Sequence, residues 1–210
     1  MDDHRRKGPI LGPFLIERFY FMKTRLNALG IAHQFITEHI KPGDLCVDAT
    51  MGRGNDTAFL CELVGETGKV VAFDVQQDAV ESTKLLLEQK GLSKRAELHL
   101  DSHSNMANYL QPETVSCITF NFGWLPGGDH KIFTQPETSI AAINQGLELL
   151  KPDGIMSLCI YYGKDTGFAE KDALLEFLPT IDSQKYTVII NSFANRPNCP
   201  PIPVMIYKRT

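Results

Sequence analysis

The chain of 210 residues has no apolar run near the length of about 20 residues that a helix needs to cross a bilayer. Its first residues, 1–7, are mostly charged, and the continuous apolar stretch and small-residue cleavage site of a secretory signal do not follow them. We therefore expect a protein that resides in the cytoplasm and has no membrane partner.

Clustered metal ligands are also missing. The five cysteines lie far apart and form no C-x-x-C pair, whereas a zinc site needs Cys or His ligands that gather. Cys46, Cys117 and Cys159 lie inside apolar runs, which is typical of buried free thiols. We therefore expect no metal cofactor.

An excess of positive charge is absent, since the formal net charge is −4. This argues against a surface coated with basic groups for nucleic acid, but a local patch of a few Lys and Arg side chains remains compatible with it. The hydrophobic fraction of 43% and the charged fraction of 22% are typical of a globular domain.

From residue 43 onward, apolar runs alternate with helical patterns. Fully apolar strands between helices predict a mostly parallel sheet that is covered by helices on both faces. The last two strands have no helix between them, so we expect an antiparallel hairpin at one edge. Seven strands with this ending predict an α/β, Rossmann-like fold of the class I methyltransferase type. The expected strands are 45–47, 69–73, 97–100, 115–120, 155–160, 186–193 and 204–207, and the expected helices 55–63, 78–90, 134–150 and 168–177.

Residues 1–42 are expected to form an N-terminal helical segment that packs on the sheet, and residues 43–210 the methyltransferase domain, within one domain overall. Apolar residues recur at helical spacing between 14 and 29, and a second helix is expected over 32–40, before Pro42 and Gly43. Thr134-Gln-Pro-Glu137 has the pattern of a capping box with Pro136 in the first turn.

Four consecutive predicted strands end in a polar residue: Asp48, Asp74, Asp101 and Asn121. In a doubly wound sheet, ligands bind beyond the carboxyl ends of the strands. The coincidence of four such residues therefore predicts a ligand site at this edge.

The loop after the first strand has the pattern D-x-x-x-G-x-G-x-D, from Asp48 to Asp56. Gly52 and Gly54 allow a sharp turn and a close approach to a ligand. The third glycine of G-x-G-x-x-G is missing, which favours a nucleoside without phosphates over a pyrophosphate. A glycine-rich turn without a ligand is the alternative.

The next two strand ends suit an adenosine. Asp74 lies about twenty residues beyond the glycines, where a carboxylate can accept both ribose hydroxyls, although it could instead cap the next helix. Gln76 is close enough to flank the adenosine, and Asp101 can reach the adenine amino group. His103 could line this pocket, act on the substrate or be an ordinary buried histidine.

Asn121-Phe-Gly-Trp124 is similar to the (Asn/Asp)-Pro-Pro-(Tyr/Phe) motif of methyltransferases that act on amino nitrogens. In that motif the amide oxygen accepts a hydrogen bond from the target amine, and the aromatic ring stacks on the target base. Phe122 and Gly123 replace both prolines, so the match is partial. Trp124, the only tryptophan, could equally be a core aromatic.

Five segments together resemble the MnmM (YtqB-like) family, whose members were long described as rRNA methylases. The segments are 48–57, 73–76, 121–129, 134–138 and 195–201, and the resemblance runs from about Leu26 to the C-terminus. It implies a homodimeric tRNA methyltransferase that uses S-adenosylmethionine and binds the anticodon loop. The family converts 5-aminomethyl-2-thiouridine at the wobble position to 5-methylaminomethyl-2-thiouridine.

The resemblance and the strand-end pattern together assign site residues. The cofactor is expected at Asn27, Asp48, Met51, Gly52, Gly54, Asn55, Asp56, Asp74, Gln76, Asp101, His103 and Asn121. The substrate is expected at Trp124, Gly127, Gly128, Tyr161, Tyr162, Lys164 and Arg196, through stacking on unstacked bases and contacts to phosphates. Asn121, Asp129 and His103 are the candidate catalytic residues.

The expected reaction needs a neutral amine aligned with the methyl carbon and the sulfonium sulfur. A dry pocket near a positive sulfonium lowers the pKa of a basic aminomethyl group. Its proton could pass to Asp129, His103 or water. No Pro-Cys motif is present, which argues against methylation of a ring carbon through a cysteine adduct.

Three other functions stay open. The same fold could methylate rRNA or a small-molecule amine. A nicotinamide-dependent oxidoreductase is a second possibility, against which the missing third glycine and Asn121 argue. The third is a nucleotide-binding module without catalysis.

Overall fold

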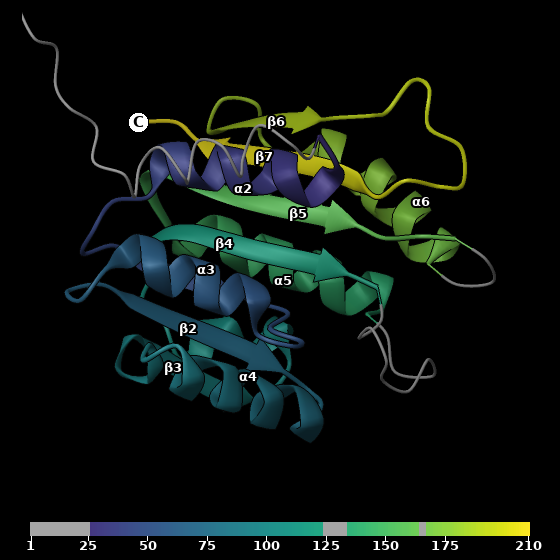
Figure 1. The fold of residues 1–210 in the computed structure, drawn as a ribbon. Coiled ribbons are helices and arrows are strands. Elements are labelled where there is room, and N and C mark those ends of the chain that lie inside the picture. Colours follow the sequence, from purple (N-terminus) through teal and green to yellow (C-terminus); the bar gives the residue numbers. More distant parts are fainter. Residues whose placement is uncertain (1–25, 124–133, 164–166) are drawn as a thin grey trace, which may run out of the picture.

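One sheet of seven strands runs through the molecule in the order β3-β2-β1-β4-β5-β7-β6 (Figure 1). The computed structural model describes residues 26–123, 134–163 and 167–210. The strands are β1 Leu45–Asp48, β2 Lys69–Asp74, β3 Ala96–Leu100, β4 Val115–Phe122, β5 Leu150–Ile160, β6 Tyr186–Ile190 and β7 Ile202–Lys208. The pairs from β3 to β5 are parallel, and β7 is antiparallel to both β5 and β6. The predicted fold class and its C-terminal antiparallel hairpin are confirmed.

Helices cover both faces of this sheet. The helices are α2 Ala28–His39, α3 Asn55–Val64, α4 Gln77–Gln89, α5 Pro136–Leu149 and α6 Phe168–Phe177, with short 3-10 turns η1 Ser93–Arg95, η2 His103–Asn108 and η3 Leu178–Thr180. Figure 1 shows α2, α3 and α4 on the near face and α5 and α6 on the far face. The two large hydrophobic cores lie on opposite faces of the sheet. One contains residues of α2, α3 and α4, and the other contains residues of η2, α5 and α6. None of the helices in the described part of the chain is long and apolar enough to cross a membrane.

The N-terminal part differs from the expectation of two helices that meet near residue 30. Helix α2 runs without a break from Ala28, because Asn27 Oδ1 accepts a hydrogen bond from Gly30 N at 2.8 Å and so caps its first turn. Most of the predicted earlier helix, 14–25, lies outside the described residues. The predicted end before Pro42 is confirmed, since His39 is the last helical residue.

The predicted capping box at Thr134 is wrong. Helix α5 begins at Pro136, and its N-cap residue, Gln135, makes no side-chain capping bond. Thr134 Oγ1 instead accepts from Gly123 N at 2.8 Å and donates to Glu170 Oε2 at 2.6 Å. The hydroxyl therefore ties the end of β4 to α6 and is not available to cap its own helix.

Two strand boundaries also differ. β5 begins at Leu150, so the segment 151–154, expected to end the preceding helix, belongs to the strand. An irregularity in the β4–β5 register between Val115 and Cys117 accommodates it. β6 ends at Ile190 and does not reach Phe193.

Candidate active site

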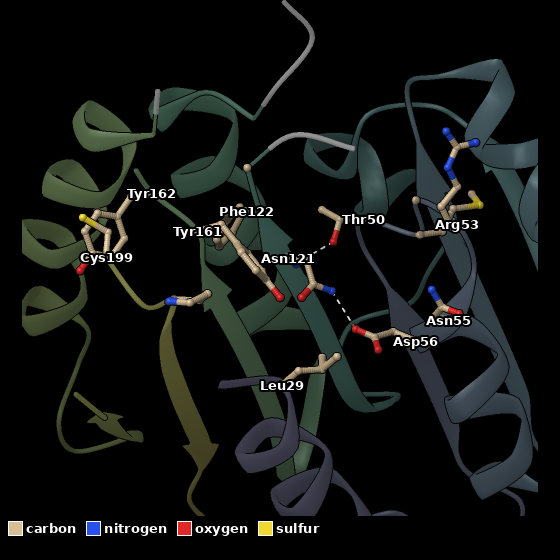
Figure 2. A pocket seen from close by; sticks show the side chains of 14 residues that line it. Leu29, Thr50, Arg53, Asn55, Asp56, Asn121, Phe122, Tyr161, Tyr162 and Cys199 are labelled. Carbon is tan, nitrogen blue, oxygen red and sulfur yellow. Dashed lines mark hydrogen bonds between the residues drawn. The ribbon is translucent and has the colours of Figure 1, made fainter. Parts of the chain in front are cut away.

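A cavity of about 410 Å³ opens beyond the carboxyl ends of β1, β4 and β5 (Figure 2). β1 and β4 are neighbours in the sheet, and the chain order reverses between them, which is where ligands bind in doubly wound folds. The lining comes from five separate parts of the chain. It consists of Leu29, Thr50, Met51, Gly52, Arg53, Asn55, Asp56, Asn121, Phe122, Gly123, Tyr161, Tyr162, Cys199 and Pro201.

The loop between β1 and α3 packs tightly against α4. Gly52 and Gly54 have φ angles of +52° and +81°, in the left-handed region that favours glycine. A Cβ on Gly54 would lie 2.9 Å from Thr83 Cα, and Thr83 Oγ1 donates to Gly52 O at 3.2 Å. The glycines are therefore needed for the turn and for this contact with α4.

Asp48 lies beneath this loop, fully buried. Its Oδ2 accepts from Thr57 Oγ1 at 2.6 Å, and its Oδ1 from Thr50 N at 3.3 Å. Burial, together with the nearby Asp56 carboxylate, raises the pKa of Asp48 to about 7. In this position Asp48 supports the loop, and its predicted contact with the cofactor stays a prediction.

Asp74 ends β2 and is fixed by two backbone amides. Gly52 N donates to Oδ2 and Gln76 N to Oδ1, each at 3.0 Å, while burial raises the pKa of this carboxyl. Beside it, Val75 and Leu100 are unusually exposed for apolar residues, at 58% and 53%. Val75 directly follows Asp74 at the end of β2, and Leu100 ends the neighbouring strand β3 in register with Asp74. This arrangement is compatible with a nucleoside whose ribose hydroxyls bind the Asp74 carboxylate and whose flat base packs against Val75 and Leu100.

Asp101 and His103 follow β3. The Asp101 carboxylate accepts hydrogen bonds from Ser102 N, Asn105 Nδ2 and Tyr109 Oη, each at 2.7 Å, and these contacts lower its pKa. An adenine amino group that binds Asp101, as predicted, would have to share the carboxylate oxygens with these three donors.

His103 is buried edge-on against Phe120 and Phe122, with ring centroids 6.0 and 6.3 Å apart. Burial lowers its pKa to about 4, so the ring is neutral at physiological pH. His103 is not among the described residues that line the cavity. Its predicted cofactor and catalytic roles stay predictions.

Asn121, at the end of β4, presents its side chain to the cavity. Its backbone N donates to Thr50 Oγ1 at 2.7 Å, and its Nδ2 donates to Asp56 Oδ2 at 2.7 Å. Figure 2 shows both contacts, with the amide oxygen on the side away from Asp56. Because the nitrogen is engaged by a carboxylate, the amide oxygen is the acceptor that this side chain offers to a ligand.

Asp56 also contacts a histidine that the sequence analysis did not single out. His33 Nε2, from α2, lies 2.8 Å from Asp56 Oδ1, and its ring stacks on Phe59 of α3 with centroids 4.0 Å apart. No motif marks this histidine, because it lies 23 residues before Asp56 in a different helix. Leu29, one turn earlier in α2, lines the cavity.

Aromatic and loop residues form the opposite wall. Tyr161 and Tyr162 directly follow β5 and line the cavity, and burial raises the pKa of Tyr161. Their predicted contacts with the substrate stay predictions. Lys171 Nζ lies 5.2 Å from the centre of the Tyr162 ring. Cys199 and Pro201 come from the segment between β6 and β7, which the family resemblance includes but to which it assigned no such role.

Some predicted residues lie apart from the cavity. The Arg196 guanidinium stacks on Phe193, 4.3 Å from the ring centre, and donates to Leu26 O. Asn27 caps α2, and Gln76 precedes α4. Trp124, Gly127, Gly128, Asp129 and Lys164 lie outside the described residues. In the described ranges, no three His, Cys, Asp or Glu side chains gather so that they could hold a metal ion.

Comparison with known proteins identifies the family. The model of the family "Putative rRNA methylase" matches residues 70–207. The Arabidopsis thaliana protein named tRNA (mnm(5)s(2)U34)-methyltransferase, chloroplastic, is 35% identical over 217 residues, which cover 98% of this chain and 78% of that protein.

Two solved structures are also similar. One, described as a "putative rRNA-methylase" from Clostridium thermocellum, has 48% sequence identity and a TM-score of 0.86, with 88% of this chain and 99% of that chain covered. The other, described as a "putative methyltransferase" from Streptococcus mutans in complex with SAH, has 37% identity and a TM-score of 0.80, with the same coverage.

The Streptococcus mutans structure contains SAH, the demethylated form of S-adenosylmethionine. The predicted cofactor is thereby confirmed. The chain belongs to the family described as "Putative rRNA methylase", the predicted MnmM (YtqB-like) family, and is an S-adenosylmethionine-dependent methyltransferase with the class I fold.

Proposed function

We propose that this enzyme methylates the aminomethyl nitrogen of 5-aminomethyl-2-thiouridine at the wobble position of tRNA, giving 5-methylaminomethyl-2-thiouridine. The name of the Arabidopsis relative, which aligns with 98% of this chain, supports this substrate. The structural observation that carries the proposal is the Asn121 amide oxygen, held toward the cavity by the contact of Nδ2 with Asp56. An amide oxygen there can accept a hydrogen bond from an amine.

The carboxyl ends of β1 to β3 would hold the cofactor. S-adenosylmethionine supplies a methyl group already activated by its bond to a positive sulfur. In the proposed arrangement the Asp74 oxygens accept the ribose hydroxyls, and the base lies against Val75 and Leu100. The Gly52–Gly54 turn brings the backbone close to the ligand, beside the cavity-lining Met51.

Asn121 would orient the reacting amine. Its Oδ1 accepts one N–H of the neutral amine, which points the nitrogen lone pair toward the methyl carbon. With the amine held in this way, methyl transfer would form the new N–C bond as the C–S bond breaks, and the electron pair of that bond would stay on sulfur. The extra proton of the product ammonium leaves to solvent. Asp129 and His103 stay predictions as alternative proton acceptors.

The aromatic wall would receive the base. Tyr161 and Tyr162 line the cavity and can stack on an unstacked uridine, as anticodon-loop bases allow. Lys171, which lies over the Tyr162 ring, adds a positive charge beside this aromatic wall. Arg53, in the loop between β1 and α3, lines the cavity. The predicted roles of Trp124, Lys164 and Arg196 in tRNA binding belong to the same proposal.

Radioactive methyl transfer by the purified protein tests the substrate. The acceptors are bulk tRNA from a strain that lacks this final methylation, rRNA from the same strain, and a panel of small primary amines. We expect label in the tRNA alone. Label in rRNA alone, which the family description would favour, contradicts the proposal, as does label in small amines alone.

We further propose that the enzyme is a homodimer in the cytoplasm. The family resemblance supports the dimer, and the edge strand β6 exposes Ile189 and Ile190 at 51% and 42%, which offers apolar surface for a second copy. Light scattering at micromolar concentration tests the assembly, and a monomer mass would contradict it. Cell fractionation tests the location.

A further inference from the structure

Three side chains from three elements form one hydrogen-bonded series that ends in the cavity. His33 Nε2 of α2 lies 2.8 Å from Asp56 Oδ1 of α3. The other carboxylate oxygen, Oδ2, accepts from Asn121 Nδ2 of β4 at 2.7 Å. Each Asp56 oxygen therefore has one nitrogen partner, one from α2 and one from β4.

In the contact between His33 and Asp56, the chemistry of the carboxylate shows which group donates the hydrogen bond. An ionised carboxylate can only accept hydrogen bonds, so Nε2 carries the hydrogen and donates it to Asp56. Besides burial, the Asp56 carboxylate contributes to the raised pKa of Asp48 in β1, of Cys159 in β5 and of Tyr161 just beyond it. None of these supplies an N–H group that could replace the imidazole.

His33 is itself held in place. Its ring stacks on Phe59 with an interplanar angle of 16°. On the same helix, Ala28 and Ala32 are buried against Cys159, with Tyr161 packed beside them. Helix α2 thus presents the imidazole from a fixed direction.

The orientation of the Asn121 amide depends on this arrangement. An asparagine side chain can present either its oxygen or its NH₂ group to a ligand, and only the oxygen can accept from an amine. The carboxylate of Asp56 selects the oxygen, because it requires the NH₂ group for itself. Asp56 is only 12% exposed, so loss of its other partner leaves an unpaired oxygen that favours rotation of the carboxylate.

We propose that His33 is a positioning residue for methyl transfer, which fixes Asp56 and, through it, the Asn121 amide oxygen toward the target amine. This inference rests on the proposed amine methylation. His33 does not touch the substrate in this account, and its effect reaches the reaction through two hydrogen bonds.

A matched pair of substitutions separates the hydrogen bond from the packing. His33→Phe keeps a ring on Phe59 but removes the donor, whereas His33→Gln restores an N–H near the position of Nε2. His39→Phe is the control, because His39 lies on the same helix and contacts Phe35 O and the Tyr207 ring, outside the cavity. The measurements are kcat and KM with undermethylated tRNA, and the Kd of S-adenosylhomocysteine by calorimetry.

We expect His33→Phe to lower kcat roughly 10- to 100-fold, since small misplacements of reacting groups have effects of this size. KM for tRNA and the Kd of S-adenosylhomocysteine should stay within about twofold. His33→Gln should recover kcat to within about fivefold of the wild type, and His39→Phe should leave it unchanged.

Two outcomes overturn the inference. One is a wild-type kcat in His33→Phe. The other is a His33→Gln enzyme as slow as His33→Phe, which would place the effect in packing. If the wild-type enzyme does not methylate tRNA, the proposed function itself is contradicted. Failure of the proposed function can therefore be distinguished from failure of the His33 inference.

A second variant keeps the test decisive if His33→Phe does not fold. Asp56→Asn can present an amide NH₂ to Asn121 and so reverse the amide that faces the amine. It should lower kcat by a similar factor. A wild-type kcat in Asp56→Asn would contradict the inference.

Discussion

The two halves of the site are built in different ways. At the ends of β1 and β2, the polar groups are fixed by the two loops that follow these neighbouring strands, as when Gly52 N and Gln76 N hold Asp74. At the end of β4, Asn121 is fixed by groups from α2 and α3, through Asp56 and His33. The proposed cofactor half is therefore held mainly by two adjoining loops, and the proposed substrate half depends on the packing of more distant segments.

This difference suggests a division of effects. Changes in the cofactor half should alter the affinity for the cofactor or the stability of the loop. Changes in the substrate half should alter the rate of the chemical step while cofactor binding persists. The following predictions separate these two classes of effect.

The largest effect is expected for Asn121→Ala. Loss of the amide oxygen removes the acceptor that orients the amine, and kcat should fall by roughly 1,000-fold, the upper range for one transition-state hydrogen bond. The Kd of S-adenosylhomocysteine should change by less than about threefold. Single-turnover kinetics and calorimetry measure the two quantities. A large loss of affinity with normal kcat would move Asn121 to the cofactor half.

Gly54→Ala should destabilise the fold by roughly 3 kcal/mol, because it combines a left-handed backbone with a severe overlap. The new Cβ would lie within 2.9 Å of Thr83, including its backbone Cα. The control is Gly91→Ala, where φ is +69° and no atom lies within 4 Å of the added Cβ. That variant should lose only about 1 kcal/mol. Urea unfolding compares them, and equal losses would mean that the contact with α4 is unimportant.

Asp74→Ala should weaken cofactor binding about 30-fold, through loss of charge-assisted hydrogen bonds to the ribose. At saturating S-adenosylmethionine, kcat should stay within about fivefold of the wild type, opposite to the pattern for Asn121→Ala. Calorimetry with S-adenosylhomocysteine, alongside steady-state kinetics, gives both numbers. An unchanged Kd would remove Asp74 from the cofactor site.

The smallest effect concerns the pH dependence of stability at Asp48. Burial raises its folded pKa to about 7, so the folded protein keeps this proton at pH values where the unfolded chain has released it. The free energy of unfolding therefore falls as pH rises from about 4 to 7 and levels off above that range. Asp48→Asn should reduce this fall by about 1–2 kcal/mol. Urea unfolding at pH 5 and pH 7.5 measures it, and an identical fall in both proteins would refute the assignment.

Much of the cofactor half could be predicted from the sequence. Asp48 and Asp74 each follow an apolar run, and parallel strands bring their carboxyl ends to one edge of the sheet. The Gly52–Gly54 turn was predicted from its two glycines, because a left-handed backbone is a local requirement that favours glycine.

The substrate half could not be predicted in the same way. His33, Leu29 and Cys199 reach the cavity through tertiary packing, which leaves no spacing in the sequence. The prediction for Thr134 failed for a related reason. Its local sequence is typical of a helix cap, but in the fold its hydroxyl contacts Gly123 and Glu170 instead. Local patterns decide which groups are available, and long-range packing decides which partner each group takes.

The central claim is that the methyl group goes to the amine of a wobble uridine. Mass spectrometry of tRNA nucleosides from a strain that lacks the gene tests it most directly. We predict accumulation of 5-aminomethyl-2-thiouridine and loss of its methylated product, with both restored by the wild-type gene and not by the Asn121→Ala variant. An unchanged level of 5-methylaminomethyl-2-thiouridine in the deletion strain would contradict the account.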